Sequence, residues 1–137
     1  MKLLLVDDHE MVRLGLKSYL SMQDRIDQVL EASDGQEGVE VALQERPDVI
    51  IMDIVMPHMT GIEATLAILK EWSDAKILIL TSYLDNEKIY PGLDAGAKGY
   101  MLKTSSAEEI LRAIRKVEPG ELAIETEVSQ KVEYRKN

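Results

Sequence analysis

Residues 49–53 read Val-Ile-Ile-Met-Asp, an unbroken run of four apolar side chains that ends in a carboxylate. A continuous apolar run is typical of a parallel strand covered on both faces, because a half-exposed strand would alternate apolar and polar residues. Residues 3–6, 77–80 and 100–102 have the same character, and residues 28–32 are a weaker candidate. The sequence therefore predicts five strands, most of them buried on both faces.

Amphipathic helical patterns lie between these candidate strands. The apolar residues at helical spacing are Val12, Leu16, Tyr19 and Leu20, then Val39, Ala42 and Leu43, then Ile62, Leu66 and Leu69, and finally Ile110, Leu111, Ile114 and Val117. Asp34 with Glu37, and Ser106 with Glu109, have the spacing of N-terminal helix caps. Strands that alternate with helices predict an α/β fold, a five-stranded parallel sheet with right-handed crossovers and helices on both faces.

The chain has the size and composition of one soluble domain with a short tail. Its 137 residues are 45% apolar and 30% charged, which is enough to build a single core. Pro119 and Gly120 end the last predicted helix. The polar stretch that follows, to Asn137, is expected to be a linker or a short extra helix.

Several classes of protein are excluded by composition. The absence of cysteine excludes a disulfide scaffold, a thiolate metal site and a thiol nucleophile. No apolar run approaches the roughly 18 residues that a membrane span needs. The apolar N-terminal stretch is also too short for a signal peptide. We therefore expect a cytoplasmic protein that does not bind membranes.

The charge balance argues against nucleic acid as a direct partner. With 16 basic and 25 acidic residues, the formal net charge is −9. Binding a polyanion requires a clustered basic face, and no such cluster is present in the sequence. DNA binding is therefore expected only through an additional domain.

Polar side chains follow the four strong apolar runs. They are Asp7 and Asp8, then Asp53, then Thr81 and Ser82, and then Lys103. Taken singly, each has an ordinary interpretation as a helix cap, a strand residue or a solvated turn residue. Because the carboxyl ends of parallel strands meet at one edge of the sheet, where ligands bind in such folds, we expect these side chains to lie together.

Together these residues indicate phosphoryl chemistry. Three carboxylates in one place repel each other unless a cation or a proton compensates. Oxygen ligands, with His9 as the single nearby imidazole, favour Mg²⁺ over zinc. A carboxylate beside Mg²⁺ can accept a phosphoryl group, while Lys103 neutralises its charge and Thr81 donates a hydrogen bond to it.

The segments that carry these side chains resemble the receiver domain of two-component response regulators. The matching stretches are Val6-Asp7-Asp8-His9, Met52-Asp53-Ile54-Val55-Met56-Pro57-His58-Met59-Thr60-Gly61, Leu80-Thr81-Ser82 and Gly99-Tyr100-Met101-Leu102-Lys103. The resemblance covers about residues 1–118. Residues 7–13, 94–97 and 102–105 are most similar to the NarL/FixJ subfamily, and within it to the cell-envelope stress regulators of Gram-positive bacteria.

This resemblance implies a flavodoxin-like receiver with strand order 2-1-3-4-5 and a set of roles at its site. Asp53 would be the phosphoacceptor. Asp8, Asp53 and the backbone carbonyl of Val55 would bind Mg²⁺, and Asp7 would reach the ion directly or through water.

The resemblance also implies a conformational switch. Lys103 would pair with the phosphoryl oxygens, and Thr81 would move toward the phosphoryl group. Tyr100 would change rotamer in step with Thr81, and the small side chain of Ser82 would leave room for the phosphoryl group to enter.

The implied partners are a sensor histidine kinase as the phosphoryl donor and a second copy of the chain on phosphorylation. DNA would be bound only through a C-terminal helix-turn-helix domain that this sequence does not contain. Residues 1–118 would be the receiver, and residues 119–137 would begin the linker toward that domain.

Two residues depart from the common receiver pattern. Thr104 follows Lys103 where many receivers have a proline with a cis peptide, and a non-proline cis bond costs about 3 kcal/mol. The geometry of this loop therefore need not follow the family. Pro91 would interrupt a helix that began after Asn86, so we expect the fourth helix to have a loose first turn or to begin near Tyr90.

Two other functions fit the same fold class less well. A Mg²⁺-dependent phosphatase with an aspartyl nucleophile commonly has a second aspartate two residues further on, where this chain has Val55. A flavin carrier would need a phosphate-binding loop after the first strand, where Asp7 and Asp8 would repel the phosphate. We therefore expect a phosphoacceptor with self-catalysed transfer and dephosphorylation rather than an enzyme that turns over a substrate.

Overall fold

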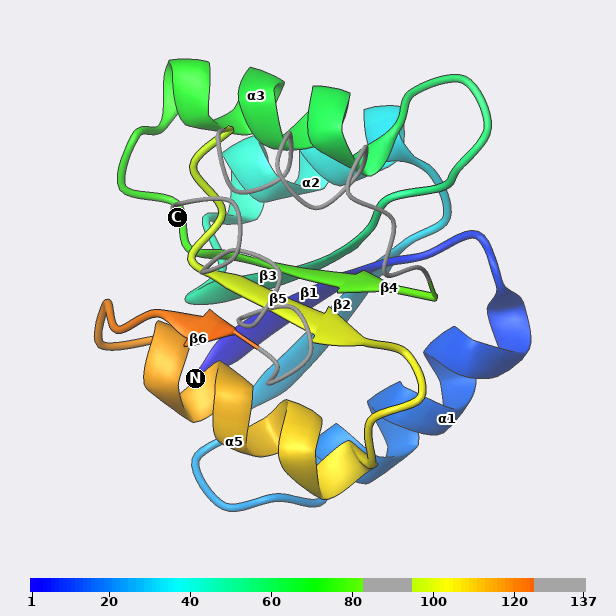
Figure 1. The fold of residues 1–137 in the computed structure, drawn as a ribbon, viewed down its shortest axis with the longest axis vertical. Coiled ribbons are helices and arrows are strands. Elements are labelled where there is room, and N and C mark those ends of the chain that lie inside the picture. The colour runs from blue at the N-terminus through cyan, green and yellow to red at the C-terminus, as the bar shows by residue number, and fades with distance from the viewer. Residues whose placement is uncertain (83–94, 125–137) are drawn as a thin grey trace, which may run out of the picture.

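The predicted sheet is present in the computed structural model of the chain, which describes residues 1–82 and 95–124 (Figure 1). The strands are β1 (Lys2–Val6), β2 (Gln28–Ala32), β3 (Val49–Asp53), β4 (Ile77–Thr81), β5 (Gly99–Leu102) and β6 (Ala123–Ile124). They pair in parallel in the order β2-β1-β3-β4-β5-β6. The predicted order of the first five strands is confirmed, including the weak candidate β2.

The predicted strand count is wrong by one, because a short strand follows the last helix. Gly120 has a φ of +106°, a left-handed backbone conformation that glycine adopts readily and that turns the chain after this helix. Ala123 N then donates to the Lys98 carbonyl at 3.0 Å, and β6 pairs with β5. The segment of β6 is thus a strand, not the predicted linker or helix, and the rest of the tail lies outside the described residues.

The described helices are α1 (Glu10–Ser21), α2 (Gly35–Glu45), α3 (Gly61–Glu71) and α5 (Ala107–Val117). The predicted caps are confirmed, because the Asp34 side chain caps α2 and Ser106 forms a capping box with Glu109 at α5. A further capping box, of Thr60 with Glu63, begins α3 and was not predicted. Among the residues that the structure describes, no helix is long and apolar enough to cross a membrane.

Two helical layers cover the sheet, α2 and α3 on one face and α1 and α5 on the other (Figure 1). Because successive side chains of a strand point to opposite faces, Leu4 and Val6 pack on the side of α2 and α3, whereas Leu3 and Leu5 pack on the side of α1 and α5. Each of these four side chains is at most 2% exposed. The predicted fourth helix, with Pro91, lies outside the described residues.

Candidate functional site

Carboxylates at the ends of β1 and β3 come together, as predicted. Asp7 directly follows β1, and Asp53 is the last residue of β3. The side chains of Asp7 and Asp53 are 9% and 5% exposed, whereas that of Asp8 is 31% exposed. One ligand atom from each of Asp7, Asp8, His9 and Asp53 lies within 4.8 Å of the others. We call these four residues the acidic cluster.

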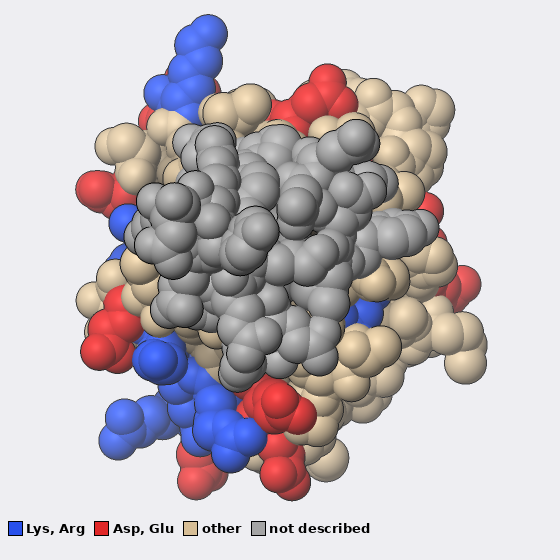
Figure 2. All heavy atoms as spheres, in the orientation of Figure 1, with Lys and Arg blue, Asp and Glu red and all other residues tan. Residues whose placement is uncertain are grey.

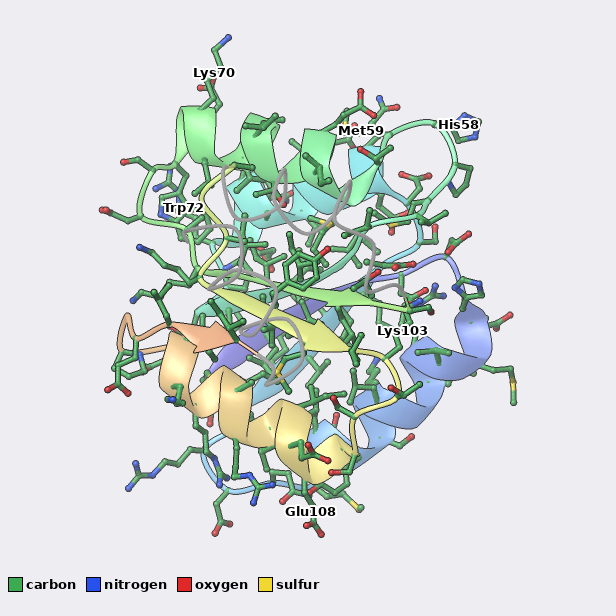
Figure 3. All side chains as sticks on the ribbon, viewed as in Figure 1. His58, Met59, Lys70, Trp72, Lys103 and Glu108 are labelled. Atoms are coloured by element: carbon green, nitrogen blue, oxygen red, sulfur yellow. The ribbon has the colours of Figure 1, made fainter. Side chains whose placement is uncertain are left out.

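Lys103 reaches the acidic cluster from the end of β5 (Figure 3). Its Nζ lies 3.1 Å from both Asp7 Oδ2 and Asp53 Oδ2. Burial lowers the pKa of Lys103, but the hydrogen bonds and charges of Asp53 and Asp7 outweigh burial and raise it above the ordinary value. Lys103 is therefore a cation held between two carboxylates at the ends of different strands.

The loop after Lys103 has ordinary trans geometry. The backbone N of Lys103 donates to the Thr81 carbonyl at 2.7 Å, and Ser105 N donates to the Leu102 carbonyl at 3.0 Å. The described residues contain no cis peptide bond. This loop therefore lacks the cis peptide that many receivers have at the position of Thr104.

The surroundings of Asp53 disfavour its charged form. Burial raises the pKa of Asp53, Lys103 partly offsets this rise, and the charges of Asp7 and Asp8 add to it, so that the pKa lies above its ordinary value. The buried Oδ2 accepts no well-aligned hydrogen bond from the described part of the chain, although Lys103 Nζ forms an ion pair with it at 3.1 Å. Additional positive charge at this point would stabilise the carboxylate.

The residues present fit a hard divalent cation. Mg²⁺ takes oxygen ligands and is usually held by one or two carboxylates. The acidic cluster offers three carboxylates, of which Asp53 is buried and short of a hydrogen-bond donor. A divalent cation would also relieve the repulsion among these carboxylates.

The two histidines of the chain lie in loops and differ in their contacts. His58 points outward from the loop before α3 (Figure 3). The side chain of His9 is 60% exposed, and its Nδ1 lies 3.0 Å from Asp7 Oδ1 and 3.2 Å from Asp8 Oδ1. These contacts of His9 were not predicted.

The other predicted site residues lie on β4, on β5 and in the loops after β3 and β4. Thr81 ends β4 and is fully buried, and Tyr100 of β5 is fully buried in the core on the side of α2 and α3. Ser82 follows Thr81 and is exposed. Val55 lies in the loop after β3 with 44% of its surface exposed. Their proposed roles stay predictions.

Arg13 secures the loop that carries Asp7 and Asp8, and its role was not predicted. Its Nη1 donates to the Asp7 carbonyl, and its Nε donates to Glu31 Oε1 at 3.1 Å. Lys17 Nζ donates to the other oxygen of Glu31 at 3.0 Å. Hydrogen bonds from Lys17 and then Arg13 outweigh burial and hold the pKa of Glu31 below its ordinary value. Arg13 therefore links the loop after β1 to β2.

Arg13→Met is expected to lower the free energy of unfolding by about 1–3 kcal/mol, because the Asp7 carbonyl and the Glu31 carboxylate lose a charged donor. Lys17→Met is the matched control. Lys17 pairs with the same carboxylate, but its side chain is 41% exposed, so its loss should cost less than about 1 kcal/mol. Urea denaturation measures both values, and equal losses would contradict the role of Arg13 in holding the loop.

The fold and the acidic cluster define a class of protein. The sequence pattern of the response regulator receiver domain matches residues 3–115, and the chain belongs to this family. The resemblance to receivers seen in the sequence is therefore confirmed.

The individual relatives are bacterial transcription and response regulators. The chain is 53% identical over 131 residues to the transcriptional regulatory protein LiaR of Bacillus subtilis (strain 168). This match covers 96% of the chain and 62% of LiaR. It is 46% identical over 134 residues to the response regulator protein VraR of Staphylococcus aureus (strain NCTC 8325 / PS 47). This second match covers 98% of the chain and 64% of VraR. The chain thus spans less than two thirds of the length of these relatives. The similarity to LiaR and VraR agrees with the relationship that the sequence predicts within the family.

Solved structures share the whole fold. The crystal structure of a two-component response regulator of the LuxR family from Aurantimonas sp. SI85-9A1 superposes with a TM-score of 0.92. The two proteins are 31% identical, and the match covers 98% of this chain and 96% of the other. The likeness therefore extends over nearly the whole length of both chains.

Proposed function

We propose that this chain accepts a phosphoryl group on Asp53 and thereby controls a transcription regulator. The observation that carries the proposal is the environment of Asp53, a 5% exposed carboxylate 3.1 Å from Lys103 Nζ and beside Asp7 and Asp8. This arrangement supplies a cation to neutralise an incoming phosphoryl group and carboxylates to hold a metal ion. Membership of the receiver family supports the same role.

The proposed transfer makes Asp53 the nucleophile. One carboxylate oxygen attacks the phosphorus of the donor, an O–P bond forms as the bond from phosphorus to the donor breaks, and Asp53 becomes an acyl phosphate. Lys103 would pair with the phosphoryl oxygens, from the side where it already contacts Asp53. Thr81, at the end of the neighbouring strand, would donate a hydrogen bond to the phosphoryl group.

We propose that the carboxylates of Asp7, Asp8 and Asp53, together with the backbone carbonyl of Val55, hold Mg²⁺. When bound, Mg²⁺ screens the repulsion between the phosphoryl oxygens and the surrounding carboxylates. Asp7 would bind the ion directly or through water. The buried Asp53 Oδ2, which lacks a well-aligned hydrogen bond from the described residues, supports a cation at this position.

Phosphorylation would then act through local contacts on a two-state element. The phosphoryl group adds negative charge and strong acceptor oxygens, which would draw Thr81 toward Asp53. Tyr100 would change rotamer in step. Tyr100 is fully buried in the core on the side of α2 and α3. A change of its rotamer would therefore change how the neighbouring core side chains pack. The exposed Ser82 would leave space for the phosphoryl group.

We propose a sensor histidine kinase as the phosphoryl donor, dimerisation of the chain on phosphorylation, and a cytoplasmic location. DNA would be bound through a C-terminal helix-turn-helix domain, toward which the stretch that begins at residue 119 and contains β6 would lead. On the face that Figure 2 shows, basic side chains gather over α5 with acidic side chains directly beside them. This mixture of charge, with a net charge of −9, supports assigning DNA binding to another domain.

Intact-mass measurement after incubation with Mg²⁺ and a small phosphodonor such as acetyl phosphate tests the proposal. We expect one added phosphoryl group, which should not form when a chelator is present during the incubation. Hydroxylamine, which cleaves acyl phosphates, should remove the group once it has formed. An adduct that resists hydroxylamine would place the phosphoryl group on another kind of residue. Continuous hydrolysis of a small phosphate ester without a stable adduct would favour a phosphatase instead.

A further inference from the structure

We propose that His9 Nδ1 is a nitrogen ligand of the acidic cluster, and that the site therefore binds divalent transition metal ions such as Ni²⁺ and Co²⁺ more tightly than Mg²⁺. The proposal rests on the proposed function of this cluster as a cation site. The oxygen ligands alone suit Mg²⁺, and the imidazole changes the chemical class of ion that the site prefers.

The imidazole of His9 lies within the set of metal-binding oxygens rather than beside it. Its Nδ1 is 3.0 Å from Asp7 Oδ1, 3.2 Å from Asp8 Oδ1 and 3.9 Å from Asp53 Oδ2. Lys103 Nζ lies 3.4 Å from the same nitrogen, so Nδ1 faces both the carboxylates and the ammonium. A metal ion bound by Nδ1 and these oxygens would lie among the atoms that now surround the nitrogen.

The backbone holds His9 in this position. His9 is the N-cap residue of α1 with φ −90° and ψ 99°, and its backbone N donates to Asp7 Oδ1 at 2.8 Å. Its carbonyl accepts from Arg13 N at 3.0 Å, within the first turn of the helix. The same carboxylate oxygen of Asp7 therefore contacts both the backbone and the ring of His9, which keeps the ring near the oxygen ligands.

A second observation points to a cation at this place. Asp53 is 5% exposed, and its buried Oδ2 accepts no well-aligned hydrogen bond within the described chain. Lys103 Nζ contacts the Oδ2 atoms of Asp7 and Asp53, whereas His9 Nδ1 lies nearest to the Oδ1 atoms of Asp7 and Asp8. His9 Nδ1 also lies 3.9 Å from Asp53 Oδ2 and 3.4 Å from Lys103 Nζ, so the ammonium and the imidazole meet at the same group of carboxylates.

The donor set predicts the order of affinities. Imidazole nitrogen is a favoured ligand of Ni²⁺, Cu²⁺ and Zn²⁺ and a poor ligand of Mg²⁺, and affinities of nitrogen and oxygen sites rise from Mn²⁺ through Co²⁺ and Ni²⁺. Removal of the ring should therefore weaken the binding of Ni²⁺ and leave the binding of Mg²⁺ nearly unchanged. A histidine that only forms a hydrogen bond to Asp7 would give no such difference between the two ions.

Isothermal titration of the tag-free chain with Ni²⁺ and with Mg²⁺ tests the proposal. For His9→Ala we expect the Kd for Ni²⁺ to rise at least about tenfold and the Kd for Mg²⁺ to change less than about twofold. His58→Ala is the matched control, because His58 lies outside the cluster and should leave both values unchanged. An unchanged Kd for Ni²⁺ in His9→Ala, or equal changes for both ions, would overturn the proposal.

Two further measurements separate this proposal from the proposed function. Asp8→Asn should weaken the binding of both Ni²⁺ and Mg²⁺. Unchanged binding of both ions would show instead that the acidic cluster is not the cation site. Pulsed electron paramagnetic resonance with Cu²⁺ as the probe should detect coupling to an imidazole nitrogen in the wild type and its loss in His9→Ala. Persistence of that coupling in His9→Ala would overturn the assignment of His9 as the ligand.

Discussion

Asp53→Asn is expected to abolish the phosphoryl adduct completely while leaving the fold intact. A side-chain amide lacks the anionic oxygen that attacks phosphorus, so no acyl phosphate can form. Asparagine has nearly the same size as the 5% exposed aspartate, and Lys103 keeps its contact with Asp7 Oδ2 at 3.1 Å. Intact-mass measurement with Mg²⁺ and a phosphodonor checks this expectation against the wild type.

Asp34→Asn is the matched control for the loss of the adduct. Asp34 caps α2 away from the acidic cluster, and asparagine caps helices about as well as aspartate. We therefore expect this variant to take up the phosphoryl group as the wild type does. If the same fraction of Asp53→Asn as of the wild type took up a phosphoryl group, a different residue would be the acceptor, and the proposed function would be contradicted.

The same Asp53→Asn substitution is expected to raise the free energy of unfolding at neutral pH. Burial is the main reason that the pKa of Asp53 lies above its ordinary value, with Lys103 offsetting part of the rise. A raised pKa in the folded state means that the folded protein binds a proton more tightly than the unfolded chain does. The contribution of Asp53 to stability is thus fully present below the ordinary aspartate pKa and is lost as the pH rises through the folded-state pKa.

Urea denaturation of the wild type and Asp53→Asn at about pH 7 and about pH 4 measures this effect. The variant should be more stable than the wild type at the higher pH, and the difference should shrink as the pH falls toward the ordinary aspartate pKa, because the charged fraction of Asp53 falls in both states. A variant that is less stable at neutral pH would mean that the ion pair of Asp53 with Lys103 outweighs the cost of burial.

Most of the sheet could be predicted because its strands are buried on both faces. The runs at residues 49–52 and 77–80 are continuously apolar, and every residue of β3 and β4 is buried. The strand β6 escaped prediction because two residues are too few to form a pattern. It depends on a turn with Gly120 at positive φ and on an open edge of β5, and the latter exists only once the sheet has formed.

The acidic cluster could be predicted for a related reason. Asp7, Asp53 and Lys103 follow apolar runs directly, and the parallel sheet brings such positions to one edge. The contact of His9 with Asp7 could not be predicted, because it depends on the side-chain and backbone contacts of Asp7, which no spacing rule describes. Arg13 was missed because its helical position alone does not reveal that it reaches a carbonyl in the preceding loop.

Gly61, the first residue of α3, approaches the backbone of Asp53 too closely for any side chain. A Cβ at this position would lie 1.9 Å from the Asp53 carbonyl oxygen and 2.8 Å from its carbonyl carbon. Gly61 N also donates to the Ile54 carbonyl at 2.8 Å, which fixes the start of the helix at this point. Because the opposing atoms are backbone atoms of Asp53 and Ile54, no flexible side chain can move aside to relieve the clash.

Gly61→Ala is therefore expected to lower the free energy of unfolding by about 3 kcal/mol or more and to slow phosphoryl uptake, since α3 can make room only by moving away from Asp53. Gly15→Ala is the matched control. A Cβ at Gly15, within α1, meets nothing within 4 Å, so alanine should stabilise the helix by about 0.5–1 kcal/mol. Urea denaturation and the rate of adduct formation measure both effects. If the two alanine variants were equally stable, Gly61 would be an ordinary helix residue. The close packing of α3 against β3 would then not be needed to position Asp53.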